Sequence, residues 1–223
     1  MFEVVVLKVL PGFGVGECDF LFSFVSLEKR VRIERFSFFE AVRNSLLGDV
    51  LVRVELCRIT GLSNRELVFD VNSHGKPFLV NTSGVHYNIS HVGDCIVCVV
   101  GDVPVGVDVE FVKPFDVSVV ERFFTVDEQV YVLSSKCDVR NMRFFEVWTK
   151  KESRIKCEGK NLGALSSFSV LDSLGQFGIF YHCVCYNGEV IGYVCSSKKE
   201  SPSIRVIDSG ELLQRANCLN KIR

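Results

Sequence analysis

The chain lacks an excess of either charge. Its 223 residues include 26 Lys and Arg and 27 Asp and Glu, which gives a formal net charge of −1 at pH 7. Proteins that bind nucleic acids independently of sequence rely on a broad basic field. The composition therefore argues against a nucleic-acid partner, and any anion that the chain binds must meet a local cluster of basic residues.

The sequence also lacks a long apolar run. A membrane helix needs about 20 mostly apolar residues in a row, and no segment approaches that length. The apolar start at residues 2–10 has no basic segment before it and no small-residue cleavage site, and Lys8 interrupts it. These features predict a first strand rather than a signal peptide. We therefore expect a soluble, cytoplasmic protein without a membrane partner.

The ten cysteines lack the regular spacing of a disulfide scaffold. Cys95 and Cys98 form a CxxC pair, but they lie in an apolar segment where residues three apart would point to opposite faces of a strand. Core packing is therefore favoured there over zinc or redox chemistry. Cys183 and Cys185 share a strand face, yet no further ligands follow in a recognisable spacing. We expect free, reduced thiols.

Strands and helices interleave along the chain, and 48% hydrophobic residues are enough for a buried core. No internal repeat or low-complexity linker is evident. The patterns predict strands at residues 2–10, 78–80, 87–89, 94–100, 105–111, 168–171, 176–185 and 190–195, and helices that end at Gly61, begin near Val117 and Thr125, and span 141–158. Turns at 101–102 and 187–188 indicate α+β layers with mostly antiparallel sheets. The polar tail from Lys198 is expected to fray.

Two carboxylates two residues apart, Asp108 and Glu110, are the most informative feature of the chain. On a strand, Val105, Val107 and Val109 can face a core while the two carboxylates project together from the other side. Like charges this close repel each other unless a cation neutralises them, and Mg²⁺ is typically held by one or two carboxylates. The pair therefore predicts a magnesium site, with Mn²⁺ as an alternative ion.

A predicted helix carries a second group of candidate residues. Trp148, Glu152 and Lys156 follow each other at intervals of four and share one helix face. On an arbitrary helix, Glu152 and Lys156 would be interpreted as a surface ion pair. Beside Asp108 and Glu110, however, Glu152 would complete an oxygen-rich metal site, and Lys156 would reach a phosphate bound to that metal.

Other polar residues admit two interpretations. Ser90 and His91 are typical of a satisfied turn, but they could also donate hydrogen bonds to phosphate oxygens. Glu128 closes a capping box that starts at Thr125, so it either caps a helix or accepts a proton. A solvated helix face explains most of the basic residues between Lys29 and Arg43. The remaining histidines are interpreted as turn or strand residues: His74, His86 and His182.

These motifs together resemble those of the surfactin-type 4′-phosphopantetheinyl transferases. The resemblance runs from about residue 26 to 170, with the motifs in the family's order and approximate spacing: Lys76-Pro77, Asn88-Ile89-Ser90-His91, Gly106-Val107-Asp108-Val109-Glu110, Arg122-Phe123-Phe124 and Trp148 through Lys160. The resemblance implies a pseudo-dimeric α+β fold of two similar halves, residues 1–112 and 113–223, with the active site in the cleft between them. Two internal halves would allow a monomer.

The resemblance implies a transfer of 4′-phosphopantetheine from coenzyme A to a serine of an apo acyl, peptidyl or aryl carrier protein. The reaction would depend on Mg²⁺ and release adenosine 3′,5′-bisphosphate. Two alternatives stay open from the residues. One is a Mg²⁺-dependent pyrophosphate hydrolase acting on coenzyme A or a nucleotide, and the other is a coenzyme A binding module without catalysis.

The resemblance also implies roles for single residues. The metal ligands are Asp108, Glu110 and Glu152; the pyrophosphate-side lysine is Lys156; the nucleotide-side residues are Lys76, Pro77, Ser90 and His91; the further phosphate-binding residues are Lys29 and Arg32. Either Glu128 or Glu152, directly or through water, would accept the serine proton. The carrier is expected to dock on residues 111–124, with Phe115 exposed in a turn after Pro114.

The chain departs from the family pattern at two positions. Asn44 stands where the family prefers an arginine for the 3′-phosphate, and Arg43, one position earlier, would have to replace it. His74 stands where the residue beside the adenine is often aromatic. Both departures concern affinity more than the type of reaction.

Overall fold

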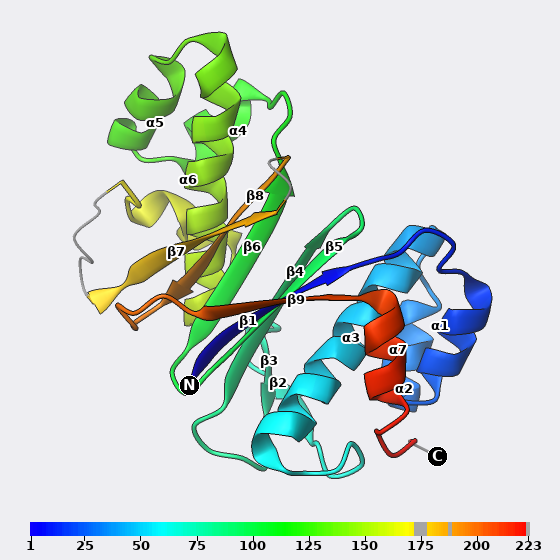
Figure 1. Cartoon of the computed structure of the whole chain (residues 1–223). Coiled ribbons are helices and arrows are strands. Elements are labelled where there is room, and N and C mark those ends of the chain that lie inside the picture. The colour runs from blue at the N-terminus through cyan, green and yellow to red at the C-terminus, as the bar shows by residue number, and fades with distance from the viewer. Residues whose placement is uncertain (172–177, 187–188, 222–223) are drawn as a thin grey trace.

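The computed structural model describes residues 1–171, 178–186 and 189–221 (Figure 1). The elements follow in this order: β1 (Phe2–Lys8), α1 (Val15–Phe22), α2 (Leu27–Ile33), α3 (Phe39–Thr60), β2 (Phe69–Val71), β3 (Pro77–Leu79), β4 (His86–Val92), β5 (Cys95–Gly101), β6 (Val105–Phe111), α4 (Val117–Phe123), α5 (Val126–Leu133), α6 (Cys137–Glu158), the 3₁₀ helix η1 (Leu162–Ser167), β7 (Phe180–Tyr186), β8 (Val190–Ser196), β9 (Ser203–Asp208) and α7 (Ser209–Ala216). Helices and strands thus alternate in both halves of an α+β fold.

The first half is built on a four-stranded sheet of order β4-β5-β1-β9. Long helix α3 packs against it because Leu46, Leu47, Val50 and Leu51 recur at helical spacing and are fully buried. The helix ends at Gly61, which adopts a φ of 71°. That left-handed conformation is easily accessible only to glycine.

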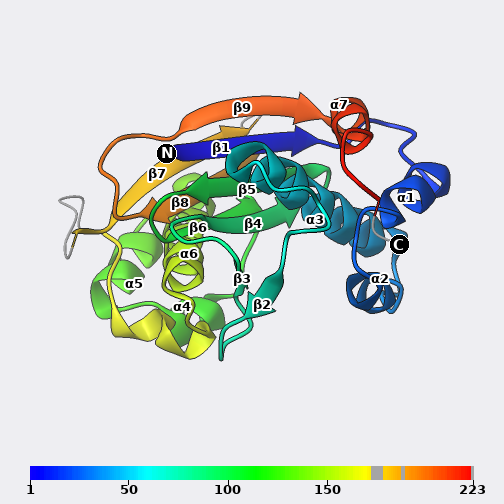
Figure 2. The same ribbon diagram turned by 90° about the horizontal axis from the view of Figure 1, so that it is seen from below.

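The second half is built on a three-stranded antiparallel sheet of order β6-β8-β7. Helix α6 lies on the side of β6 and β8 that faces away from β1 and β9 (Figure 2). The contact between α6 and β6 is close enough to require a glycine, since a Cβ at Gly106 would lie 2.1 Å from the carbonyl oxygen of Ser153. This approach places the predicted site residues of α6 beside those of β6.

A valine-rich layer joins the two sheets. Val4, Val6 and Val97 of the first sheet pack in one buried cluster with Val105 and Val107 of the second. The inward alternation predicted for β6 is confirmed, because its valines are buried.

Strand β4 contacts β6 through side chains instead of a backbone ladder. The side-chain oxygen of Asn88 accepts a hydrogen bond from the backbone N–H of Val107 at 2.9 Å, and the hydroxyl of Ser90 accepts one from that of Val109 at 3.4 Å. These contacts bring Ser90 beside the carboxylate strand.

Most predicted elements are confirmed, and three are wrong. The tail after Lys198 does not fray, because β9 pairs in parallel with β1 and α7 follows it. Residues 168–171 are not a strand but follow the 3₁₀ helix η1. Helix α6 begins at Cys137, one turn before the predicted start. The predicted strand start at 176 and the turn at 187–188 lie outside the described residues.

The eight cysteines with described side chains form no disulfide, as expected; the side chain of Cys185 is among those not described. The division at residue 112 stays a prediction. The halves named for the structure follow the two sheets instead. Strand β6 belongs to the second half because it pairs with β8, and residues 203–216 belong to the first half because β9 pairs with β1. Neither of the two longest helices, α3 and α6, nor any other described helix combines the length and apolarity needed to cross a membrane.

Candidate active site between the two halves

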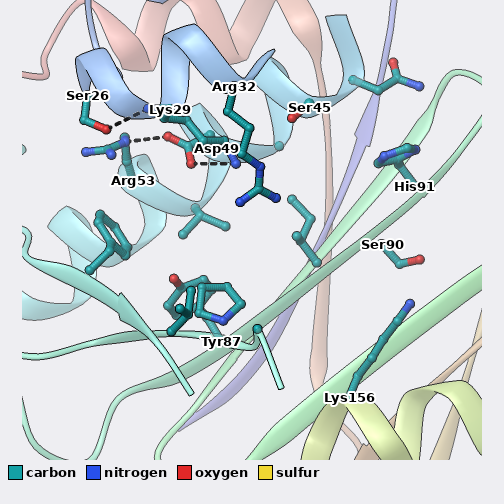
Figure 3. A pocket seen from close by; sticks show the side chains of 18 of the residues that line it. Ser26, Lys29, Arg32, Ser45, Asp49, Arg53, Tyr87, Ser90, His91 and Lys156 are labelled. Atoms are coloured by element: carbon teal, nitrogen blue, oxygen red, sulfur yellow. Dashed lines mark hydrogen bonds and ion pairs between the residues drawn. The ribbon is translucent and has the colours of Figure 1, made fainter. Parts of the chain in front are cut away.

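A cavity of about 1240 Å³ lies between the halves (Figure 3). The first half lines it with residues of α2, α3, the β2–β3 hairpin and β4, and the second half with residues of β6 and α6. Of the predicted site residues, the cavity lining includes Lys29, Arg32, Pro77, Ser90, His91, Asp108, Glu110, Glu152 and Lys156. It does not include Arg43, Lys76 or Glu128.

Asp108 is the most buried of the three predicted metal ligands, with 4% of its surface exposed. Its Oδ1 accepts hydrogen bonds from the Lys156 ammonium at 2.6 Å and from the Ser90 hydroxyl at 3.1 Å. Its Oδ2 is buried and has no hydrogen-bond partner among the described residues. Burial raises the pKa of Asp108, although Lys156 opposes the shift. A buried carboxylate oxygen without a partner is costly.

Glu110 and Glu152 are half-buried beside Asp108. Burial and the Asp108 charge raise the pKa of Glu110. Burial and the Asp108 charge also raise the pKa of Glu152 to about 7, while Lys156 partly offsets the shift. The three carboxylates therefore lie close enough to disfavour one another's ionised form, and a nearby cation would favour it.

The donor set fits a hard divalent cation. Carboxylate oxygens are the ligands that Mg²⁺ prefers, and the partnerless Oδ2 of Asp108 is available as one of them. The part of the chain that the structure describes holds no cluster of three or more His, Cys, Asp or Glu side chains already arranged as metal ligands. An ion at this end would therefore have to draw Glu110 and Glu152 toward Asp108.

The other end of the cavity is basic. Ser26 caps α2 by accepting a hydrogen bond from the backbone N–H of Lys29, whose ammonium lies 3.4 Å from Asp49. Asp49 also pairs with Arg53 at 2.7 Å. Arg32 extends from α2 into the cavity (Figure 3). Cationic side chains thus face the cavity at an end separate from Asp108, Glu110 and Glu152.

Ser90 and His91 differ in exposure. The Ser90 hydroxyl is engaged with Asp108 and with the backbone of Val109. The His91 side chain lines the cavity and is partly exposed there. Its remaining burial and the nearby Lys156 charge lower the pKa of its imidazole. A neutral imidazole can still donate one hydrogen bond to a phosphate oxygen.

Arg43 does not line the cavity. Its guanidinium pairs with Asp94 at 2.5 Å and donates to the side-chain oxygen of Asn44 at 3.1 Å. Asn44 itself lines the cavity and donates to the carbonyl of Gly93. That Arg43 replaces the family arginine at the 3′-phosphate stays a prediction. Its contacts with Asp94 and Asn44 do not support that role.

Glu128 is fully buried and forms the predicted capping box by accepting a hydrogen bond from the Thr125 backbone N–H at 2.8 Å. Its other oxygen accepts one from the Val170 N–H at 2.8 Å. The equally buried Lys151 ammonium lies 2.8 Å away and donates to two backbone carbonyls. The capping box is confirmed, whereas proton transfer by Glu128 stays a prediction without support from its position.

Phe115 is not the exposed turn residue that we expected. It is half-buried and stacks on Phe144, with ring centroids 4.0 Å apart. Two apolar residues of the segment that are exposed are Phe111 and Val117. Phe115 is thus wrong as an exposed anchor, and the docking surface at residues 111–124 stays a prediction.

Several lining residues were missed by sequence reasoning, among them Asp49, Arg53, Phe69 and Tyr87. The spacing of Asp49 and Arg53, four apart on a helix, was a usable signal for their ion pair. Arg53 also makes a cation–π contact with Phe69, and its guanidinium carbon lies 4.8 Å from the ring centroid. This contact joins residues that are distant in sequence. No local pattern could have predicted it.

Two family models match the chain in tandem. The model described as 4′-phosphopantetheinyl transferase, N-terminal, matches residues 15–102, and that of the 4′-phosphopantetheinyl transferase superfamily matches residues 104–190. The two matches meet just before β6, where the chain leaves the first sheet for the second.

Three similar proteins come from bacilli. The 4′-phosphopantetheinyl transferase Sfp of Bacillus subtilis (strain 168) is 37% identical over 203 residues, which cover 86% of this chain and 91% of that protein. The 4′-phosphopantetheinyl transferase ffp of Bacillus subtilis is 41% identical and covers 69% of each chain. The 4′-phosphopantetheinyl transferase psf-1 of Bacillus pumilus is 41% identical over 66% of this chain and 63% of that protein. With its two halves, its shared cavity and these relatives, the chain belongs to the surfactin-type family of 4′-phosphopantetheinyl transferases.

Proposed function

We propose that this enzyme transfers the 4′-phosphopantetheine group of coenzyme A to a serine of an apo carrier protein and releases adenosine 3′,5′-bisphosphate. The observation that carries the proposal is one cavity with a basic end on α2 and a carboxylate end on β6 and α6. Its volume of about 1240 Å³ exceeds the usual range for drug-sized ligands. A long, phosphate-rich molecule such as coenzyme A suits both its size and its polarity.

The basic end is assigned to the nucleotide. Lys29 and Arg32 lie where charge-assisted hydrogen bonds to phosphate oxygens would be favourable. His91 lines the same cavity and can donate to a phosphate as well (Figure 3). The apolar wall of the β2–β3 hairpin, with Phe69 and Pro77, suits a planar base.

The carboxylate end is assigned to the pyrophosphate and the reaction. Asp108, Glu110 and Glu152 would hold Mg²⁺, or Mn²⁺ in its place, and the bound ion would neutralise charge on the pyrophosphate. The Lys156 ammonium pairs with the Asp108 carboxylate at 2.6 Å, and both residues line the cavity. Its ammonium is therefore poised to move to the leaving phosphate when the anion arrives.

The serine proton is assigned to Glu152, directly or through one water. Glu152 lines the cavity, where its carboxylate would accept the proton of the bound serine near neutral pH. Serine is a weak nucleophile at that pH, so its positioning in line with the β-phosphorus should account for much of the rate. Glu128, the other candidate, does not line the cavity, and its carboxylate caps α5 instead.

Intact-mass analysis tests the proposal. An apo acyl, an apo peptidyl and an apo aryl carrier protein are each incubated with the enzyme, coenzyme A and Mg²⁺. Covalent gain of the phosphopantetheine mass on one carrier supports transfer and identifies the carrier class. A parallel reaction with chelator in place of Mg²⁺ should show no gain.

The same experiment separates the alternatives. Adenosine 3′,5′-bisphosphate without carrier modification would mean pyrophosphate hydrolysis. Binding of coenzyme A without either product would mean a binding module. Either result would contradict the transferase proposal.

A further inference from the structure

The β2–β3 hairpin forms a wall of the cavity and also contacts the other half of the molecule. Its strands pair only with each other among the described residues, and Phe69, Val71 and Pro77 line the cavity. The turn between the strands, residues 72–76, lies against the end of α6. One short element therefore joins the nucleotide end of the cavity to the helix that carries Glu152 and Lys156.

Two side chains of this turn make the cross-half contacts. The Lys76 ammonium donates to the carbonyl of Cys157 at 2.9 Å and to that of Val105 at 3.1 Å. The Asn72 amide donates to the carbonyl of Gly159 at 3.0 Å. Val105 is the first residue of β6, and Cys157 and Gly159 lie at the end of α6. The turn thus holds the start of the carboxylate strand and the end of the carboxylate helix together.

The turn is organised to present these donors. The side-chain oxygen of Asn72 accepts hydrogen bonds from the backbone N–H groups of His74 and Lys76, both at 2.9 Å. The backbone N–H of Asn72 donates to the carbonyl of Lys76 at 2.9 Å. Asn72 is therefore fixed in orientation, which is characteristic of an Asx turn.

The helix end is shaped to receive the turn. Gly159 adopts a φ of 65°, and a Cβ on it would lie 2.5 Å from the Asn72 amide nitrogen. The carbonyls at a helix C-terminus lack partners within the helix and carry its negative end. An ammonium and an amide N–H are the groups that such carbonyls accept well.

Neither Lys76 nor Asn72 lines the cavity. Their polar atoms are directed to backbone carbonyls of the second half, and burial of the Lys76 ammonium there lowers its pKa. This arrangement differs from the nucleotide contact that the family resemblance implies for Lys76. Any effect of Lys76 and Asn72 on the reaction would therefore come from how they position α6 and β6.

We propose that Lys76 and Asn72 are positioning residues, which we name the cross-half tether, and that they hold the end of α6 against β6 so that Glu152 and Lys156 stay beside Asp108. The proposal deepens the proposed function, on which its kinetic part rests. Its structural part is independent of that function.

Hydrogen exchange tests the structural part without any activity measurement. Lys76→Met keeps an apolar side chain about as long as the lysine stem and removes the ammonium. In this variant the amides of residues 155–159 should exchange about tenfold faster, because hydrogen bonds from a charged donor are lost there. Lys160→Met is the matched control, since Lys160 lies just past the same helix and its exposed ammonium pairs with the nearby Glu158. This control should leave the exchange rates unchanged.

Asn72→Asp provides a second variant that preserves the turn. An aspartate can still accept the bonds from His74 and Lys76, but it places an oxygen against the Gly159 carbonyl, where the amide now donates. The same amides of α6 should exchange faster. If Lys76→Met failed to fold, Asn72→Asp would still decide the outcome.

Kinetics distinguish positioning from nucleotide contact. The tether predicts a kcat about tenfold lower in Lys76→Met and a calorimetric Kd for coenzyme A within a factor of two of that of the unaltered enzyme. A Kd raised about tenfold with unchanged kcat would assign Lys76 to the nucleotide and overturn the proposal. So would unchanged exchange in both variants. If the unaltered enzyme modified no carrier, the proposed function would fail, whereas the exchange result would still decide the tether.

Discussion

The two ends of the cavity are built in different ways. At the carboxylate end, Asp108 lies on a central position of β6, is almost fully buried, and faces a helix whose backbone touches the strand at Gly106. At the basic end, Lys29 and Arg32 lie on the seven-residue helix α2, and Arg32 is exposed. The first arrangement fixes atoms through tightly packed backbone. The second presents long side chains from a short helix, with Arg32 exposed and Lys29 half-buried beside Asp49.

This difference matches the demands of the two proposed tasks, recognition of the nucleotide and reaction at the pyrophosphate. Reacting groups must be held to within a fraction of an ångström, which packed regular elements can achieve. Recognition of a phosphate tolerates long, mobile cations because charge attraction depends weakly on orientation. We therefore expect substitutions at the carboxylate end to change turnover and stability, and substitutions at the basic end to change affinity.

The largest effect is expected for Asp108→Asn. The substitution removes one anionic group from the end that would hold the dication, so turnover should fall about hundredfold or more. Far-UV circular dichroism should be unchanged. Asp19→Asn, which neutralises an exposed carboxylate on α1, is the matched control. Turnover near that of the unaltered enzyme at limiting Mg²⁺ would remove Asp108 from the metal assignment.

Glu128→Gln should chiefly reduce stability. It leaves the fully buried Lys151 ammonium without its anionic partner, a change worth about 3 to 5 kcal/mol in comparable buried pairs. Urea unfolding measures the loss. Adding Lys151→Met to the same protein should recover part of it. A large fall in turnover with unchanged stability would instead support a proton-accepting role for Glu128.

Gly106→Ala tests the packed contact behind the carboxylate end. The added methyl group would overlap the α6 backbone, which should cost about 1 to 3 kcal/mol and lower turnover by displacing α6. Gly16→Ala is the control, because a Cβ there meets no atom within 4 Å. Equal stability and turnover in Gly106→Ala would show that the close contact is not needed.

Lys29→Ala should have the smallest of these effects and act on affinity. Loss of one charge-assisted phosphate contact should raise the Kd for coenzyme A about tenfold while kcat at saturation changes little. Arg30→Ala on the same helix is the control, since Arg30 pairs with Glu34 and does not line the cavity. An unchanged Kd in Lys29→Ala would break the assignment of α2 to the nucleotide.

The alternation of β6 and the capping box at Thr125 could be predicted because both depend on neighbours in sequence. The burial of Val105 and Val107 and the bond from the Thr125 N–H to Glu128 confirm these local patterns. The common helix face of Glu152 and Lys156 is local as well, and both residues line the cavity.

Long-range contacts could not be predicted in this way. The tail from Lys198 is polar, and it forms β9 only because the edge of β1 is available to pair with it. The ammonium of Lys76 is directed by carbonyls far away in sequence, and Glu128 meets Lys151 only after α5 packs on α6. Phe115 is held by Phe144 in the same manner. Each of these residues has an ordinary local sequence, and tertiary packing decides its partner.

A crystal structure of the enzyme with coenzyme A and Mg²⁺ tests the central claim most directly. We predict that one coenzyme A molecule spans the cavity, with nucleotide phosphates at Lys29 and Arg32 and with Mg²⁺ bound by Asp108, Glu110 and Glu152 next to the pyrophosphate. A nucleotide bound at the carboxylate end, or a cation held away from these three residues, would contradict the division of the cavity into a recognising and a reacting end.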